Sequence, residues 1–251
     1  MKVFNCIPEW ITARQLITNQ SIGFVPTMGA LHQGHFSLIE KSLNENDHTV
    51  VSLFLNPTQF DNPSDLANYP CSLAEDLASL ETLKVKSVLV PTFNDIYPNV
   101  YKYLIQEKEF SNKLCGARRP GHFEGVLTVV MKLFNIVRPH TAYFGEKDFQ
   151  QLQLIKEMVT DFFLPLKISA VPTVREKDGL AMSSRNKRLN SFERDLAPKF
   201  YEALKNSKHP EEAKEFLEEV GFKVDYIEEH NHRRFGAVYL GPVRLIDNVE
   251  V

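Results

Sequence analysis

The 251-residue sequence is poor in cysteine, and its three cysteines lie far apart. Cys6, Cys71 and Cys115 form no Cys-x-x-Cys pair, and an odd number of cysteines cannot all pair within one chain. This spacing is typical of reduced, structural thiols in the cytosol. It excludes a small secreted domain built on disulfides.

Long apolar runs and an excess of one charge are also missing. No apolar run approaches the ~20 residues that a membrane helix needs, and the first ten residues lack the apolar core of a signal peptide. The net charge of −3 creates no basic field for nucleic acid or anionic lipid. We therefore expect a cytoplasmic protein with no membrane or nucleic-acid partner. An anionic ligand would need a local cluster of Lys, Arg and His.

Strand-like and helix-like patterns alternate through the first two thirds of the chain. This alternation predicts an α/β fold, a Rossmann-like parallel sheet with helices on both faces. Ligands of such sheets bind beyond the carboxyl ends of the strands. The expected strands are residues 23–26, 49–55, 87–92, 141–145 and 166–174, and the expected helices are residues 36–43, 72–84, 126–137 and 149–163.

The texture changes after residue 174, where the chain becomes polar and basic. Two amphipathic helices are expected at residues 191–207 and 210–220, and two short strands at residues 223–228 and 237–243. This pattern indicates a small α+β C-terminal domain. We therefore divide the chain into a first domain, residues 1–173, and a second, residues 174–251.

The turn at residues 26–35 carries the strongest chemical signal. His32 and His35 are three residues apart, so they share one face at the start of the following helix. Unpaired backbone N–H groups and the helix dipole make that place suitable for a phosphate. Gly29 and Gly34 allow a ligand close to the backbone. On these residues alone, two polar histidines beside an ordinary turn remain an alternative.

Two further polar turns follow strands. Asn56 and Gln59 carry amides that can hold a hydroxyl and a carboxylate together. In the other turn, Lys147 suits a phosphate. Asp148 either accepts from ribose hydroxyls or caps the next helix, with Gln151 at its third position.

Two basic segments complete the set of candidates. Ser183, Ser184 and Arg185 offer hydroxyls and a fork-shaped cation for the β- and γ-phosphates, unless they belong to a solvated interdomain loop. Arg119 and His122 are placed to approach an acyl substrate or phosphates. Their Pro- and Gly-containing segment would also serve as a plain loop before a buried helix.

Together these segments resemble the pantothenate synthetase (pantoate–β-alanine ligase) family of the nucleotidyltransferase superfamily, whose signature is His-x-Gly-His. The resemblance covers nearly all of residues 23–190 and resumes at residues 243–248; the second domain between them looks short for the family. It implies that (R)-pantoate, β-alanine and ATP give pantothenate, AMP and pyrophosphate through a pantoyl adenylate. It also implies Mg²⁺ and a homodimer.

The resemblance assigns roles to individual residues. His35 is the primary catalytic residue, as proton donor, and His32, Lys147 and Arg185 are the other catalytic ones. The implied ATP contacts are Met28, Gly29, Ala30, Leu31, His32, Gln33, Gly34, His35, Gly145, Glu146, Lys147, Asp148, Val174, Met182, Ser183, Ser184 and Arg185. The implied substrate contacts are Gln59 and Gln151, with Asn56, Arg119 and His122 beside them.

One segment departs from the family pattern Tyr-Pro-Arg-Thr. Cys71 stands at the arginine position and removes a cation, while Ser72 replaces the threonine and is expected to cap the next helix with Glu75. Glu75 and Asp76 are candidate Mg²⁺ ligands, because Mg²⁺ prefers carboxylates with phosphate oxygens and water. A capping glutamate and a surface aspartate remain the alternative.

Two other functions compete with this interpretation. A related nucleotidyltransferase that acts on another acceptor would share the histidines and the Ser-Ser-Arg loop, but has no evident need for Gln59 and Gln151 together. A non-catalytic nucleotide-binding module would explain Cys71 and the short second domain. The joint presence of His32, His35, Lys147 and Arg185 argues against it.

Overall fold

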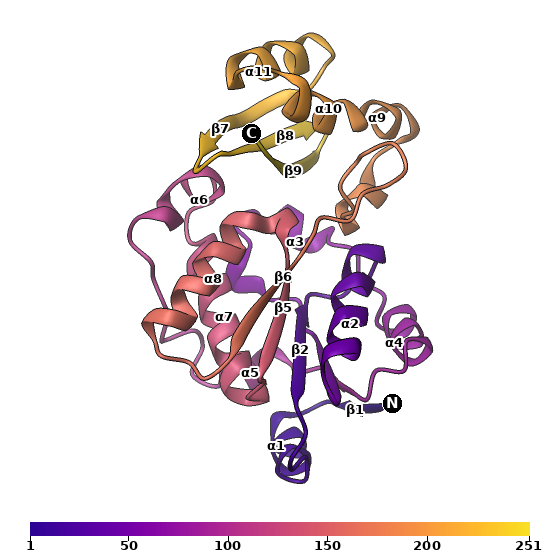
Figure 1. Ribbon diagram of the computed structural model, residues 1–251, viewed down its shortest axis with the longest axis vertical. Helices are drawn as coiled ribbons and strands as arrows, with labels where there is room; N and C mark the ends of the chain where they lie inside the picture. The colour runs from indigo at the N-terminus through magenta and orange to yellow at the C-terminus, as the bar shows by residue number, and fades with distance from the viewer.

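The computed structural model describes residues 1–251 and contains two sheets, one stacked on the end of the other (Figure 1). The larger sheet is parallel, with six strands in the order β1-β4-β3-β2-β5-β6. Its strands are β1 Lys2–Phe4, β2 Ile22–Thr27, β3 His48–Leu53, β4 Ser87–Leu89, β5 Thr141–Gly145 and β6 Lys167–Val171. The smaller sheet is antiparallel, with β7 Lys223–His230, β8 Arg233–Leu240 and β9 Val243–Glu250.

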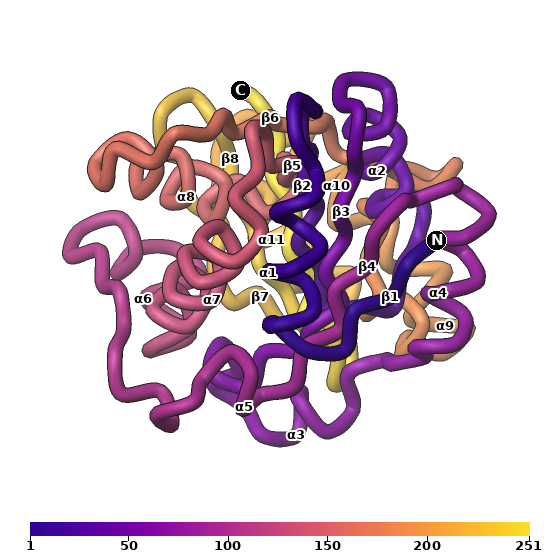
Figure 2. Tube along the Cα trace, turned by 90° about the horizontal axis from the view of Figure 1, so that it is seen from below, coloured from indigo at the N-terminus to yellow at the C-terminus, as the bar shows by residue number.

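Helices cover both faces of the parallel sheet, as Figure 2 shows for α7 and α8 on one side and α2 and α4 on the other. Successive strand residues therefore enter different cores: Phe24 packs with α7 and α8, and Val25 packs with α2 and α4. This double burial explains why the strands are continuous apolar runs. The helices of this part are α1 Ile7–Gln15, α2 Gln33–Glu45, α3 Pro63–Ala67, α4 Leu73–Thr82, α5 Phe93–Ile96, α6 Leu114–Arg118, α7 His122–Val137 and α8 Phe149–Asp161.

The antiparallel sheet has a core of its own on one face and meets the first part on the other. The helices α10 Pro198–Asn206 and α11 Pro210–Glu219 pack on it, preceded by α9 Ser191–Leu196. On the opposite face Tyr226 and Phe235 join the apolar cluster of α7 and α8. The ring of Phe235 lies 6.1 Å from that of Phe149 at the start of α8. The antiparallel sheet thus covers the end of the parallel sheet.

The predicted fold class is confirmed. The details differ in three places. The helix expected at residues 191–207 is broken into α9 and α10, because Pro198 begins a new helix and cannot donate in the old one. The strand expected at residues 237–243 is instead the end of β8, a turn and the start of β9. Ser72 stands at the N-cap of α4 but makes no capping hydrogen bond, so that prediction is wrong.

The division into residues 1–173 and 174–251 stays a prediction. None of the helices is long and apolar enough to cross a bilayer.

Candidate active site

A cavity of about 490 Å³ lies between the carboxyl ends of the parallel strands and the antiparallel sheet. Its walls are the turns after β2, β3 and β5, the start of α7 and the loop that leads into the C-terminal part. This is the end of a parallel sheet where ligands are expected. The predicted residues that line it are Met28, His32, Gly34, His35, Asn56, Gln59, Arg119, His122, Gly145, Lys147, Asp148, Gln151, Val174, Met182, Ser183, Ser184 and Arg185.

The two signature histidines cap their own helix. His32 is the N-cap of α2, and its Nδ1 accepts the backbone N–H of Gly34 at 3.1 Å. His35, three residues on, accepts the backbone N–H of His32 through its own Nδ1 at 3.3 Å. A Cβ on Gly34 would lie 2.9 Å from the His32 ring, so only glycine leaves room for this arrangement.

This capping corrects one expectation. The first amides of α2 were expected to cradle a phosphate, but those of Gly34 and His35 already have partners within the turn. The imidazoles take over as donors. Because each Nδ1 accepts a backbone hydrogen, each neutral ring carries its proton on Nε2. The site therefore offers two side-chain N–H donors at the wall of the cavity.

The charge state of these rings follows from their surroundings. Burial lowers the pKa of His32 to about 4, and the positive charge of Lys147 adds to the effect. Burial also lowers the pKa of His35 to about 3, with further contributions from His32 and Lys147. Both imidazoles are thus neutral at physiological pH. They can stabilise developing negative charge as hydrogen-bond donors rather than as cations.

The turn that precedes the two histidines is held in place by a buried carboxylate. Asp76 of α4 accepts the backbone N–H of Ala30 at 2.8 Å through Oδ2 and that of Leu31 at 2.7 Å through Oδ1. Gly29 has φ +84° and Ala30 has φ +52°, so the turn uses left-handed backbone that needs support. Asp76 is only 4% exposed. It does not line the cavity, so its carboxylate supports the turn and does not face a ligand there.

Five predictions at this turn and α4 are not supported by the geometry of the cavity. Gly29, Ala30 and Leu31 do not line the cavity, and neither does the exposed Gln33; two of these amides are spent on Asp76. The fifth prediction is the Mg²⁺ site at Glu75 and Asp76. Asp76 is buried beneath the turn, Glu75 is exposed, and neither lines the cavity, so neither carboxylate faces an ATP bound there. Glu146 likewise lies off the cavity wall.

Asn56 supports Gln59 rather than a substrate. Its Nδ2 donates to Gln59 Oε1 at 3.1 Å and to the Gly125 carbonyl at 3.2 Å. Its Oδ1 accepts from Thr58 at 3.0 Å and Tyr97 at 3.1 Å, which leaves no polar group for a ligand. The predicted substrate contact at Asn56 is therefore replaced by a positioning role. Gln59 lines the cavity, and its Nε2 remains available as a donor.

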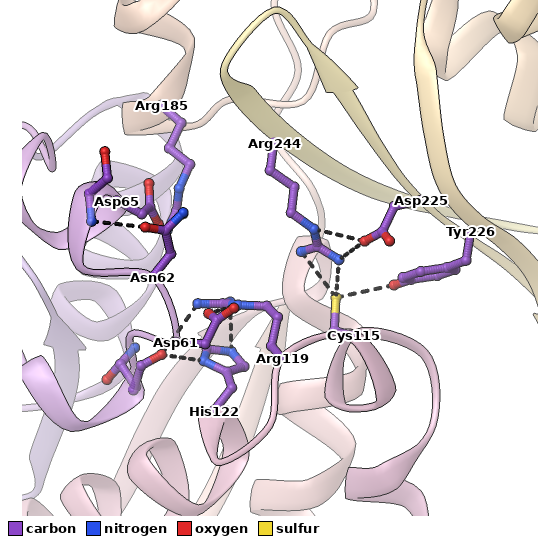
Figure 3. A network of polar contacts seen from close by, with 12 residues as sticks. Asp61, Asn62, Asp65, Cys115, Arg119, His122, Arg185, Asp225, Tyr226 and Arg244 are labelled. Carbon is purple, nitrogen blue, oxygen red and sulfur yellow. Dashed lines mark hydrogen bonds and ion pairs between the residues drawn. The ribbon is translucent and has the colours of Figure 1, made fainter.

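Arg119 and His122 brace the same turn from the other side. His122 Nδ1 donates to the Gln59 carbonyl at 2.7 Å, and His122 Nε2 accepts from Arg119 at 3.1 Å. Arg119 also pairs with Asp61 at 2.7 Å (Figure 3). Burial and the neighbouring Arg119 charge lower the pKa of His122 to about 3. The expected direct contacts of this pair with substrate or phosphate are not what the geometry favours.

The turn after β5 and the start of α8 present three predicted side chains to the cavity, those of Lys147, Asp148 and Gln151. Gln150 also borders the cavity, but its amide bonds to the Cys115 N–H and to the carbonyls of Phe110 and Lys113. Asp148 stands at the N-cap of α8 but makes no capping bond, so its carboxylate is not committed to the helix. Lys147 Nζ lies 3.9 Å from Asp148 Oδ1. This turn can therefore offer one cation and one acceptor to a nucleotide.

Residues of the last strand fix this turn and the following loop, and sequence reasoning missed them. Asn248 of β9 donates to the carbonyls of Glu146 at 3.0 Å and Lys147 at 2.9 Å. Asp247 forms a two-point pair with Arg175, at 2.5 and 3.0 Å. The family-like segment at residues 243–248 was the available signal. A strand far along the chain thus holds the cavity wall.

The predicted phosphate loop is a short hairpin that ends in the turn η4 Ser184–Arg188. It closes on itself through the Met182 N–H and the Val174 carbonyl at 3.0 Å. The Ser184 hydroxyl donates to that of Tyr69 at 3.0 Å. Arg185 pairs with Asp65 of α3 at 2.8 Å. Cys71, at the position of the family arginine, is exposed and outside the cavity.

Comparison with known proteins shows the family of the chain. A sequence model described as Pantoate-beta-alanine ligase matches residues 2–250. A pantothenate synthetase of Bdellovibrio bacteriovorus is 55% identical over 231 residues, 92% of each chain. One of Legionella pneumophila is 49% identical over 249 residues, 99% of each chain.

Two solved structures are similar along the whole chain. The crystal structure of the pantoate-beta-alanine ligase of Francisella tularensis, complexed with beta-gamma ATP and beta-alanine, is 47% identical with a TM-score of 0.96 and 100% and 97% coverage. The pantothenate synthetase of Thermus thermophilus is 37% identical, with a TM-score of 0.93 and 100% and 99% coverage. The second domain is therefore not short beside these relatives, and that expectation was wrong.

The role of the Asp76 carboxylate, which supports the turn before His32 and His35, can be tested by replacing one of its oxygens with an amide nitrogen. Asp76→Asn keeps the size but turns one acceptor into a donor that faces a backbone N–H. We expect the free energy of unfolding to fall by about 2–3 kcal/mol in urea titrations. The neighbouring exposed Glu75→Gln is the matched control, and it should change stability by less than about 0.5 kcal/mol. Equal effects of the two variants would contradict the role of Asp76.

The depressed histidine pKa values make a second prediction. Below pH 6.5 the unfolded chain binds protons at these histidines, whereas folded His32, His35 and His122 stay neutral down to about pH 4, 3 and 3. The free energy of unfolding should therefore fall as the pH drops from 6.5 to 4. His122→Asn, which keeps a donor near the Gln59 carbonyl, should flatten this slope by up to about 1.4 kcal/mol per pH unit. A slope that does not change would contradict the assignment.

Proposed function

The chain belongs to the pantoate-β-alanine ligase family, and from that premise we propose that it condenses (R)-pantoate with β-alanine, with ATP converted to AMP and pyrophosphate. The observation that carries the proposal is the joint placement of His32, His35, Gln59 and Gln151 on one cavity. Imidazole donors serve the phosphates of ATP. Two amides serve a small hydroxy acid. The Francisella relative, complexed with beta-gamma ATP and beta-alanine, supports the same pair of ligands here.

The first step makes a good leaving group. A carboxylate cannot be attacked by an amine directly, because oxide would have to leave. One carboxylate oxygen of pantoate therefore attacks the α-phosphorus of ATP, the bond to the β-phosphate oxygen breaks, and pyrophosphate leaves. Pantoyl adenylate remains. Transfers of this kind need positioning and charge stabilisation more than covalent help from the protein.

The histidines are suited to stabilise that step. The Nε2–H groups of His32 and His35 donate to the oxygens on which negative charge grows. A preorganised donor of this kind is worth a factor of about 10²–10³ in rate. His35 keeps the primary catalytic role, but as a neutral hydrogen-bond donor whose orientation is fixed by its own helix cap.

Three cationic or hydroxyl-bearing residues face the departing pyrophosphate. Lys147 supplies a point charge, Arg185 a planar cation and Ser183 a hydroxyl, and all three line the cavity. Asp148 is placed to accept from the ribose. In this proposal the C-terminal part, residues 174–251, acts as a lid, because its loop carries two of these contacts.

The glutamines orient the acid. Gln59 donates through Nε2, since its oxygen already accepts from Asn56. Gln151, at the start of α8, also lines the cavity and has both an acceptor and a donor. In the second step the β-alanine nitrogen attacks the acyl carbon of the adenylate, and AMP leaves. The new bond is the amide of pantothenate.

In the proposed mechanism, Mg²⁺ binds only together with ATP. The candidate ligands Glu75 and Asp76 do not fit, for the reasons of geometry given above. A Mg²⁺ ion that arrives with ATP can be held by phosphate oxygens and water, as is usual for this ion. No step of the mechanism is assigned to it. A homodimer and a cytoplasmic location also stay predictions of the family resemblance.

One assay separates this function from its two rivals. AMP release is measured with pantoate and β-alanine together and with each alone. We expect full release only with both substrates. Pyrophosphate release without free AMP, in the presence of another acceptor, would favour a different nucleotidyltransferase, because such an enzyme leaves the nucleotide on its acceptor. No release with any combination would favour a non-catalytic module.

The role of His35 can be separated from its structural one. His35→Asn retains an oxygen near the Nδ1 position for the cap but loses the Nε2–H donor. We expect pantoate-dependent ATP–pyrophosphate exchange to fall by about 10²-fold, the scale of one donor, with little loss of stability. His140→Asn is the control, because His140 Nδ1 also accepts a backbone N–H, from Ile22 at 2.9 Å, at the other end of β2. Near-normal exchange in a folded His35→Asn variant would contradict the assignment.

A further inference from the structure

Asp65 joins two arginines that come from far along the chain. It lies in α3, a five-residue helix that Asn62 caps through the Ser64 N–H at 2.8 Å. Its Oδ2 accepts from Arg185 at 2.8 Å and its Oδ1 accepts from Arg188 at 2.6 Å. Figure 3 shows Asp65 and Arg185 lying next to each other. All three side chains line the cavity.

The two guanidinium groups depend on this carboxylate to lie near one another. They carry like charges, and each is only about one fifth exposed, at 23% and 20%, so water screens them poorly. Each gives Asp65 a single N–H, from Nη2 of Arg185 and Nη1 of Arg188. A guanidinium has five donors, so most of them remain for a ligand. One carboxylate thus assembles a two-arginine site.

The charges around Asp65 determine the protonation state of its carboxyl group. Burial alone would raise the pKa of its carboxyl, but the hydrogen bonds and charges of Arg185 and Arg188 outweigh burial and hold that pKa below its ordinary value. The carboxylate is therefore ionised at physiological pH. The Arg185 guanidinium also lies 5.4 Å from the ring of Tyr69, which accepts from Ser184 of the same turn. Residues 62–69 hold η4 at three points.

We infer that Asp65 is a positioning residue that holds Arg185 and Arg188 together as one binding site for the pyrophosphate portion of ATP. This inference rests on the proposed function and extends it to two residues, Asp65 and Arg188, that the proposal leaves without a role. A diphosphate carries enough oxygens to take donors from both guanidinium groups. We expect the phosphate of AMP, which the histidines serve in the proposed mechanism, to bind independently of this pair.

The test measures direct binding by calorimetry on the full chain, with inorganic pyrophosphate and AMP as two separate probes. Asp65→Asn keeps the shape but presents an amide N–H to one arginine. We expect the affinity for pyrophosphate to fall by roughly tenfold, since charge-assisted bonds are lost, and the affinity for AMP to stay within about twofold. Asp65→Glu, which restores the charge, should recover most of the loss.

A matched control comes from the same segment. Asp61→Asn also removes a carboxylate from an arginine pair, that with Arg119, but leaves η4 untouched. It should leave the affinity for pyrophosphate within about twofold of the unsubstituted protein. In steady-state assays Asp65→Asn should raise the KM for ATP and not the KM for β-alanine. A merely structural defect would change both KM values and would appear in the melting temperature.

Three results would overturn the inference. One is unchanged or tighter pyrophosphate binding in Asp65→Asn, which would make Asp65 a bystander or a competitor of the anion. Another is an equal loss for AMP, and the last is no pyrophosphate binding by the unsubstituted protein. Failure of the proposed function looks different: AMP release with pantoate and β-alanine would be absent while pyrophosphate affinity still depended on Asp65.

Discussion

Two histidines that cap their own helix set the geometry of this cavity. The Nδ1 of each ring accepts a backbone N–H, so each neutral ring carries its proton on Nε2 and can donate it. The same contacts fix the start of α2 and the direction of both donors. The turn before them depends on Asp76, which holds two amides from beneath. The hydrogen bonds that stabilise this βα junction are therefore the same ones that orient the two donors.

Other parts of the cavity are also held in place by supporting hydrogen bonds. Asn56 and His122 hold Gln59 from its side chain and its carbonyl. Asn248, from the last strand, holds the carbonyls of the turn that carries Lys147. Polar side chains that sequence patterns place in the site are thus divided into two kinds. Some keep a free group for ligands, and others are fully used in keeping that group in place.

Much of this could be predicted from the sequence. Alternating apolar runs predicted the parallel sheet, and the positions of His32, His35 and Gln151 after strands placed them on the cavity. What could not be predicted was how backbone amides and side-chain oxygens would be shared. A sequence does not show that Asn56 has no acceptor left, or that Asp76 reaches back 45 residues to Leu31. Asp65 lacked any motif, because its partners lie 120 and 123 residues away.

The central claim is that a pantoate carboxylate oxygen attacks the α-phosphorus of ATP in this cavity. It is tested most directly with pantoate labelled with ¹⁸O in its carboxylate, turned over with ATP and β-alanine and followed by mass spectrometry of the products. The account predicts one ¹⁸O atom in each AMP formed and none in the pyrophosphate. Label in inorganic phosphate, with ADP as the nucleotide product, would contradict it.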